Sequence, residues 1–160
     1  MKPEPIADIV VVGAGAAGLL SAIMAKRHTP SANVLLVDSR QKIGAKILIS
    51  GGTRCNVTHE RVLPSDYQGG PRHFIKHVLQ AFTPEQTLDF FKEIGVELIL
   101  EPTGKYFPVT HSGKTVLEAL MKEAERLGVV LKTGMRIEGV RKKEELFSLK
   151  DNAGEIFWTR

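Results

Sequence analysis

Residues 8–27 read DIVVVGAGAAGLLSAIMAKR, and this stretch decides the fold. Its β-branched run Ile9–Val12 is typical of a short parallel strand that is buried on both faces. The glycines that follow, Gly13, Gly15 and Gly18, give the pattern GxGxxG. In this pattern the first glycine permits a tight turn, the second lets a pyrophosphate approach the backbone, and the third lets the helix pack closely on the strand.

A helix and a second strand complete this unit. The alanine-rich segment from Ala16 to about Lys26 predicts a helix whose amino end presents free N–H groups and a positive dipole end to a phosphate. The apolar run Val34–Val37 then ends at Asp38, whose carboxylate can accept hydrogen bonds from both hydroxyls of a ribose. Strand, glycines, helix, strand and acid together predict a βαβ unit that binds a dinucleotide. A βαβ unit that binds nothing is the alternative.

The composition narrows the class of protein. The chain has 160 residues, enough for one domain, and 22 Lys and Arg against 18 Asp and Glu give a net charge of only +4. Because the basic residues are scattered, we expect no nucleic-acid partner. The single cysteine cannot form an internal disulfide, which favours a cytoplasmic location. We expect no membrane span, because there is no long apolar run, and no signal peptide, because the opening MKPEPIAD is polar and contains prolines. Residues 1–5 are expected to be a disordered start.

The segment after the second strand predicts a second binding element. Residues 39–56 form a long connection, and loops of this length are usually functional or disordered. Gly51 and Gly52 can present successive backbone N–H groups to an anion, while Lys46 and Arg54 add positive charge on either side. A tight turn flanked by solvated basic residues is the alternative.

The rest of the chain mixes helical and strand patterns. His73 and His77 stand four residues apart, but no third ligand accompanies them, so we predict no metal site. Thr83 and Gln86 form a capping box before a helix. The fold class is therefore α/β, a parallel sheet with helices followed by a β-meander, whereas a plain dehydrogenase domain would continue with repeated βα units. The patterns predict helices at 73–82, 84–95 and 115–128, two strands joined by a turn at 102–105, a further strand at 129–133, and meander strands at 135–143, 145–151 and 155–160.

Three segments carry a resemblance to a known family. GAGAAGL at 13–19, GAKILISGGTRCNVT at 44–58 and YFPVTHSGKTVLEAL at 106–120 resemble the bacterial flavoproteins of the aminoacetone oxidase family, also described as BaiN-like or HI0933-like. The resemblance runs through nearly all 160 residues and implies a Rossmann-like FAD-binding domain over residues 1–160, with FAD as the cofactor.

The resemblance also implies the cofactor-binding residues. It places the pyrophosphate at the glycine turn, the adenosine ribose at the end of the second strand, the flavin at the 46–56 segment, and a backbone contact to adenine at the start of the meander. In that order the residues are Gly13, Gly15, Ala16, Ala17 and Gly18, then Asp38 with Ser39, then Lys46, Ser50, Gly51, Gly52, Arg54, Cys55 and Asn56, and finally Ile137.

The chain departs from the family pattern in two respects. The family commonly reads GGGRCN where this chain has Thr53, and a β-branched residue cannot easily adopt a positive φ. Members of the family are also about two to three times longer, with a second domain and a C-terminal return to the sheet. We therefore expect a truncated FAD-binding domain whose uncovered sheet edge favours self-association.

The expected function is the FAD-binding portion of a flavin-dependent oxidoreductase that acts on a small-molecule substrate and takes electrons from NAD(P)H. An NAD-dependent dehydrogenase domain and a non-catalytic nucleotide-binding module are the alternatives. Cys55 has no CxxC partner, so we expect a packed or flavin-adjacent thiol. No catalytic acid or base is assigned, because the candidates His111 and Tyr106 lack a spacing argument.

Overall fold

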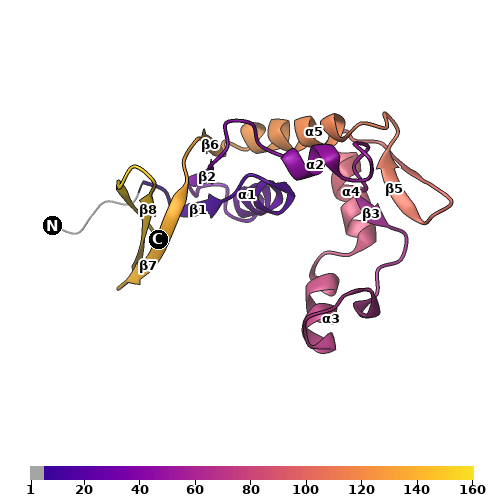
Figure 1. Ribbon diagram of the computed structural model, residues 1–160, viewed down its shortest axis with the longest axis horizontal. Helices are drawn as coiled ribbons and strands as arrows, with labels where there is room; N and C mark the ends of the chain where they lie inside the picture. The colour runs from indigo at the N-terminus through magenta and orange to yellow at the C-terminus, as the bar shows by residue number, and fades with distance from the viewer. Residues whose placement is uncertain (1–5) are drawn as a thin grey trace. The chain divides into compact units, whose positions relative to one another are not determined.

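The computed structural model describes residues 6–160 and divides them into two compact units (Figure 1). The expected disordered start at residues 1–5 lies outside the described residues. The first unit comprises the chain up to Lys46 together with Leu120–Arg160, and the second comprises Ile47–Ala119. In the described part of the chain, no helix is long and apolar enough to cross a membrane.

A parallel sheet forms the centre of the first unit. Strand β1 (Ile9–Val12), helix α1 (Ala16–His28) and strand β2 (Val34–Asp38) confirm the predicted βαβ unit, and β6 (Val130–Thr133) pairs with the other edge of β2. The strand order is β1-β2-β6, so β2 is central, and its four apolar residues are buried. The prediction that β1 is buried on both faces is wrong, because β1 is an edge strand among the described residues and Val12 stays 52% exposed.

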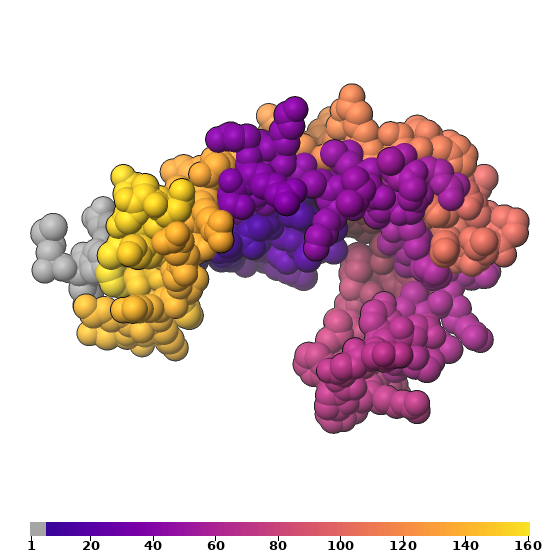
Figure 2. All heavy atoms as spheres, in the orientation of Figure 1, coloured from indigo at the N-terminus to yellow at the C-terminus, as the bar shows by residue number. Residues whose placement is uncertain are grey.

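The predicted β-meander is confirmed. Strands β7 (Ile137–Lys143), β8 (Leu146–Asp151) and β9 (Ile156–Thr159) pair in antiparallel order, and all three reach the surface (Figure 2). The end of β9 is joined to the residues before β1, because the Thr159 hydroxyl donates to the Ala7 carbonyl at 3.0 Å. Ala7 packs with Leu35 and Val37 of β2, and the start of the meander packs against that cluster.

The second unit is built around a small antiparallel sheet. Strands β3 (Thr58–His59), β5 (Lys105–Pro108) and β4 (Leu98–Leu100) pair in that order, which confirms the predicted turn between β4 and β5. The predicted helices correspond to α3 (Arg72–Ala81), α4 (Pro84–Glu93) and α5 (Gly113–Arg126). The interpretation of 39–56 as a loop is wrong for its middle part, where α2 (Ala45–Ile49) forms and buries Ile47. The 3₁₀ helix η1 (Pro64–Asp66) lies in the segment before α3.

Helix α4 begins as predicted. The Thr83 hydroxyl accepts a hydrogen bond from the Gln86 backbone N–H at 3.3 Å, and the Gln86 side chain accepts one from the Thr83 N–H at 2.8 Å. This capping box satisfies two backbone donors that the helix leaves free. The rings of Phe90 and Phe91 are buried within the second unit, and Phe90 packs edge to face on Phe82, before the helix, with ring centroids 6.4 Å apart.

A buried carboxylate joins α1 to the part of α5 that belongs to the first unit, from Leu120 onwards. Glu123 of α5 accepts hydrogen bonds from Arg27 of α1 and from Arg126, whose Nε lies 2.7 Å from Glu123 Oε2. The hydrogen bond from Arg126 and the nearby charge of both arginines lower the pKa of Glu123 to about 2, against the opposing effect of burial. The carboxylate is therefore ionised at neutral pH and satisfied within the unit.

We predict that Glu123→Gln lowers the free energy of unfolding by about 2 kcal/mol at pH 7, the usual scale for hydrogen bonds to a charged group. The pKa of Glu123 is depressed in the folded state, so its contribution is complete above about pH 4.5 and is lost as the pH falls towards 2. Urea unfolding at pH 7 and pH 3 measures this difference.

Glu118→Gln is the matched control, because Glu118 is an exposed residue of the same helix and pairs only loosely with Lys114. It should change the stability little at either pH. A Glu123→Gln penalty that is equally large at pH 7 and pH 3 would contradict the role given to the ionised carboxylate.

Candidate functional site

The glycines of the turn after β1 are of two kinds: some are required by the fold, and one borders open space. Gly13 has φ 99° and donates its N–H to the Val37 carbonyl at 2.7 Å. A Cβ at Gly18 would lie 1.7 Å from the Gly13 carbonyl oxygen, which confirms that Gly18 lets α1 pack closely on β1. A Cβ at Gly15, by contrast, would meet no atom within 4 Å. The fold therefore requires Gly13 and Gly18, whereas the space beside Gly15 is free.

The amino end of α1 is also free. Gly15 is the N-cap residue and supplies no side-chain cap, and the first turn holds no acidic residue. Ala16 and Ala17 are exposed there. Uncapped N–H groups and the positive end of the helix dipole thus meet the open space at Gly15, an arrangement that suits a phosphate or another anion.

Asp38 has a structural task that sequence reasoning missed. Its Oδ2 accepts a hydrogen bond from the Ala14 N–H at 2.7 Å, and its Oδ1 accepts one from the Arg40 N–H, also at 2.7 Å. The side chain therefore ties the glycine turn to the end of β2. Each oxygen keeps a second lone pair, so the predicted contact with a ribose is compatible with this geometry.

The first unit brings most of the predicted adenosine contacts to one end of the sheet. Ser39 follows Asp38 and is exposed, and the backbone N–H of Met135 donates to the Asp38 carbonyl at 2.9 Å. Ile137 begins β7 two residues later and packs on the cluster that includes Val37. The backbone contact of Ile137 with adenine stays a prediction.

The predicted flavin segment of the second unit has a left-handed backbone. Gly51, Gly52 and Thr53 have φ 54°, 66° and 71°, and Cys55 has φ 63°. Thr53 thus adopts the positive φ that a β-branched residue disfavours. Two hydrogen bonds hold the segment, from the Cys55 N–H to the Ser50 carbonyl at 3.0 Å and from the Gly113 N–H to the Thr53 carbonyl at 2.8 Å.

Close packing explains one glycine of this segment. A Cβ at Gly51 would lie 2.7 Å from the Phe107 ring and 2.8 Å from the backbone nitrogen of Asn56. A Cβ at Gly52 would meet no atom within 4 Å, and both glycines are exposed. Lys46 of α2 is exposed as well and belongs to the first unit. Anion binding by these groups stays a prediction.

Arg54 is held by its own unit. Its guanidinium forms an ion pair with Glu101, lies 4.1 Å from the centroid of the Phe107 ring, and donates from Nε to the Gly51 carbonyl at 3.4 Å. The geometry therefore gives Arg54 a structural role within its own unit. A contact with flavin stays a prediction.

Cys55 is a packed thiol. The residue is 7% exposed, and burial raises its pKa although a hydrogen bond with Ser50 opposes the shift. The thiol is therefore protonated at neutral pH and a poor nucleophile.

Asn56 and His59 form a pair that the sequence gave no reason to expect. Asn56 Nδ2 lies 2.9 Å from His59 Nε2, whereas Asn56 Oδ1 is buried and has no hydrogen-bond partner in the described part of the chain. Nothing in the motif points to His59, because the contact arises only when the chain turns back into β3.

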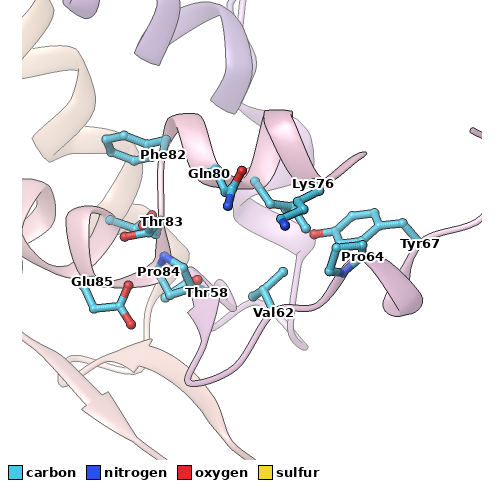
Figure 3. Close-up of a pocket in the computed structure, with 12 residues that line it drawn as sticks. Thr58, Val62, Pro64, Tyr67, Lys76, Gln80, Phe82, Thr83, Pro84 and Glu85 are labelled. Carbon is cyan, nitrogen blue, oxygen red and sulfur yellow. The ribbon is translucent and has the colours of Figure 1, made fainter. Parts of the chain in front are cut away.

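A cleft of about 430 Å³ lies elsewhere in the second unit (Figure 3). Lys76 and Gln80 reach it from α3, and Val62 and Pro64 come from the segment after β3. None of the predicted cofactor residues lines this cleft. Tyr106 instead lines a separate hollow against α4, and His111 is exposed with φ 51°.

Comparisons with known proteins identify the family and the fold of the chain. The family model described as HI0933-like protein Rossmann domain matches residues 7–159. Among solved structures, the fold resembles a 3-ketosteroid-delta4-(5alpha)-dehydrogenase from Rhodococcus jostii RHA1, with a TM-score of 0.66 and 17% identity over 100% of this chain and 45% of that one. The chain thus shares its fold with part of that larger protein.

Two curated relatives are more similar in sequence. A 3-dehydro-bile acid delta(4,6)-reductase from Clostridium scindens is 35% identical over 89% of this chain and 34% of its own length. A ribosomal RNA dihydrouridine synthase from Escherichia coli K12 is 33% identical over 91% of this chain and 36% of its own length. The chain therefore spans about a third of the length of these relatives.

We predict that Thr53→Gly raises the free energy of unfolding by about 1 kcal/mol, because it removes the cost of a left-handed β-branched residue. Thr103→Gly is the control, since Thr103 is also an exposed turn residue but has no positive φ. That change should destabilise the protein slightly, because glycine adds backbone entropy to the unfolded chain. Chemical denaturation compares the two, and destabilisation by both would refute strain at Thr53.

Proposed function

The chain belongs to the HI0933-like protein family and carries its Rossmann domain, and from this membership we propose that it is the FAD-binding portion of a flavin-dependent oxidoreductase. The free amino end of α1 beside Gly15 supports this proposal most directly. It offers uncapped N–H groups and unobstructed space where the FAD pyrophosphate would lie. The FAD-binding domain of this proposal comprises residues 1–160.

The remaining contacts divide by unit. In the first unit, the free lone pairs of Asp38 would hold the ribose, with Ser39 and the backbone of Ile137 next to the adenosine. In the second unit, residues 50–56 would line the flavin. FAD supplies hydride chemistry when it is bound. The chain's own residues bind and orient it.

The names of the two curated relatives suggest the bond that is reduced. A delta(4,6)-reductase of 3-dehydro bile acids and a dihydrouridine synthase both add two hydrogens across a carbon–carbon double bond. In each substrate that bond is conjugated to a carbonyl group. We therefore propose the reduction of a carbonyl-conjugated double bond. The β-carbon gains a hydride, the α-carbon gains a proton, and NAD(P)H is oxidised to NAD(P)⁺.

The alternatives have less support. An NAD-dependent dehydrogenase domain would continue with further βα units, whereas this chain continues with an antiparallel meander. A non-catalytic nucleotide-binding module would bind FAD in the same way but would not catalyse the oxidation of NAD(P)H. A small-molecule substrate, a cytoplasmic location and self-association through the open edge of β1 remain parts of the proposal, the last supported by the exposed Val12.

We predict that Gly15→Ala weakens FAD binding at least tenfold and leaves the unfolding temperature almost unchanged, because its Cβ meets ligand space and no protein atom. Gly18→Ala should destabilise the fold itself, because its Cβ collides with the Gly13 carbonyl. Titration of FAD fluorescence and thermal unfolding separate the two effects. Unchanged FAD affinity in folded Gly15→Ala protein would refute the pyrophosphate site.

We predict that the FAD-loaded protein oxidises NAD(P)H when a 3-oxo-4,6-diene bile acid or a uridine-containing RNA is supplied. The saturated 3-oxo bile acid is the control and should give no turnover, since it lacks the double bond. Anaerobic loss of NAD(P)H absorbance measures the reaction. Turnover of a secondary alcohol with NAD⁺ and without flavin would instead support the dehydrogenase alternative.

A further inference from the structure

Asn56 carries an acceptor that the protein leaves unused. Its Oδ1 is buried and has no hydrogen-bond partner among residues 6–160. Buried polar atoms are nearly always paired, so an unpaired one in a folded protein requires an explanation such as a bound molecule. The atom belongs to the segment of residues 50–56 that we propose for the flavin.

His59 fixes the orientation of this side chain. The amide Nδ2 of Asn56 can only donate, so His59 Nε2, at 2.9 Å, is the acceptor of this hydrogen bond. His59 is itself clamped in β3, because the Val57 N–H donates to Tyr106 at 2.9 Å and the Glu60 N–H donates to Gly104 at 2.8 Å. Rotation of the amide would therefore break the bond to a fixed partner.

The backbone of Asn56 is equally confined. A Cβ at Gly51 would come within 2.8 Å of its nitrogen and 3.4 Å of its Cβ. The left-handed conformation of Cys55, with φ 63°, sets the direction in which the chain enters Asn56. Oδ1 is thus held in place from two sides.

The side chains of Ser50 and Arg54 in the same segment are already engaged. Glu101 meets the charge of Arg54, and the Ser50 hydroxyl donates to the Ile47 carbonyl at 3.0 Å. Within the described residues, Asn56 alone keeps a buried side-chain acceptor that has no hydrogen-bond partner. An acceptor fixed in this way selects a ligand that offers an N–H or O–H donor.

We propose that His59 is a positioning residue that holds Asn56 so that Oδ1 accepts a hydrogen bond from the flavin ring. The donor is N3–H, because the oxidised isoalloxazine ring has only this N–H group. This inference rests on the proposed FAD function and adds a residue that no cofactor motif contains. Neither Asn56 nor His59 takes part in proton transfer in this arrangement.

The test compares the affinity for FAD with that for 3-methyl-FAD, which lacks the N3–H donor. The unaltered protein should bind FAD at least tenfold more tightly than the methylated analogue. Asn56→Leu and His59→Leu should bind the two flavins equally well, because the oriented acceptor is lost. His59→Gln should keep the discrimination, since its amide oxygen can replace Nε2 as acceptor. Fluorescence titration gives each dissociation constant.

His77→Leu is the matched control, because His77 is an exposed histidine on α3, and this variant should behave like the unaltered protein. If His59 had a purely structural role, His59→Leu would weaken the binding of both flavins by the same factor and preserve the ratio of the two dissociation constants. That result would overturn the inference. An unaltered protein that binds both flavins equally would also overturn it. Failure of the unaltered protein to bind FAD at all would overturn the proposed function as well.

Discussion

The carboxylate of Asp38 is the interaction on which the first unit depends. Both of its oxygens accept backbone N–H groups, one from Ala14 in the glycine turn and one from Arg40 after β2. Its own carbonyl accepts the N–H of Met135, which leads from β6 into the meander. Asp38 therefore holds three chain segments at the carboxyl end of the sheet: the glycine turn, the residues after β2 and the residues after β6. A bridge with acceptors on both oxygens requires a carboxylate, since an amide would offer only one.

The second unit depends on a backbone constraint instead. The left-handed run from Gly51 to Thr53 reverses the chain after α2 and is held against β5 and the start of α5. Gly51 leaves room for the Phe107 ring, and Arg54 lies over that ring while pairing with Glu101. The positive charge of Arg54, which the sequence suggests for anion binding, is thus partly neutralised by an ion pair within the second unit. What the loop leaves unsatisfied is an amide oxygen, which points to a hydrogen-bonded ligand atom.

The sequence predicts those features that depend on local chemistry. The βαβ unit, the capping box at Thr83 and the meander follow from periodicity, glycines and turn residues, and the structure confirms them. Features that depend on tertiary contacts were missed. Ile47 is buried in α2, Arg54 pairs with Glu101 forty-seven residues away, and His59 contacts Asn56 through the turn into β3. Thr53 shows that backbone hydrogen bonds can hold a conformation that the side chain disfavours.

The buried state of Cys55 has a practical consequence. It is the single cysteine of the chain, it lies in the second unit, and its thiol is protonated and shielded from solvent. A thiol reagent can reach it only when the loop around it opens. The protein thus contains a natural reporter of local unfolding, since the rate of labelling gives the free energy of that opening. Slower labelling when FAD is present would measure how strongly the cofactor closes this part of the molecule.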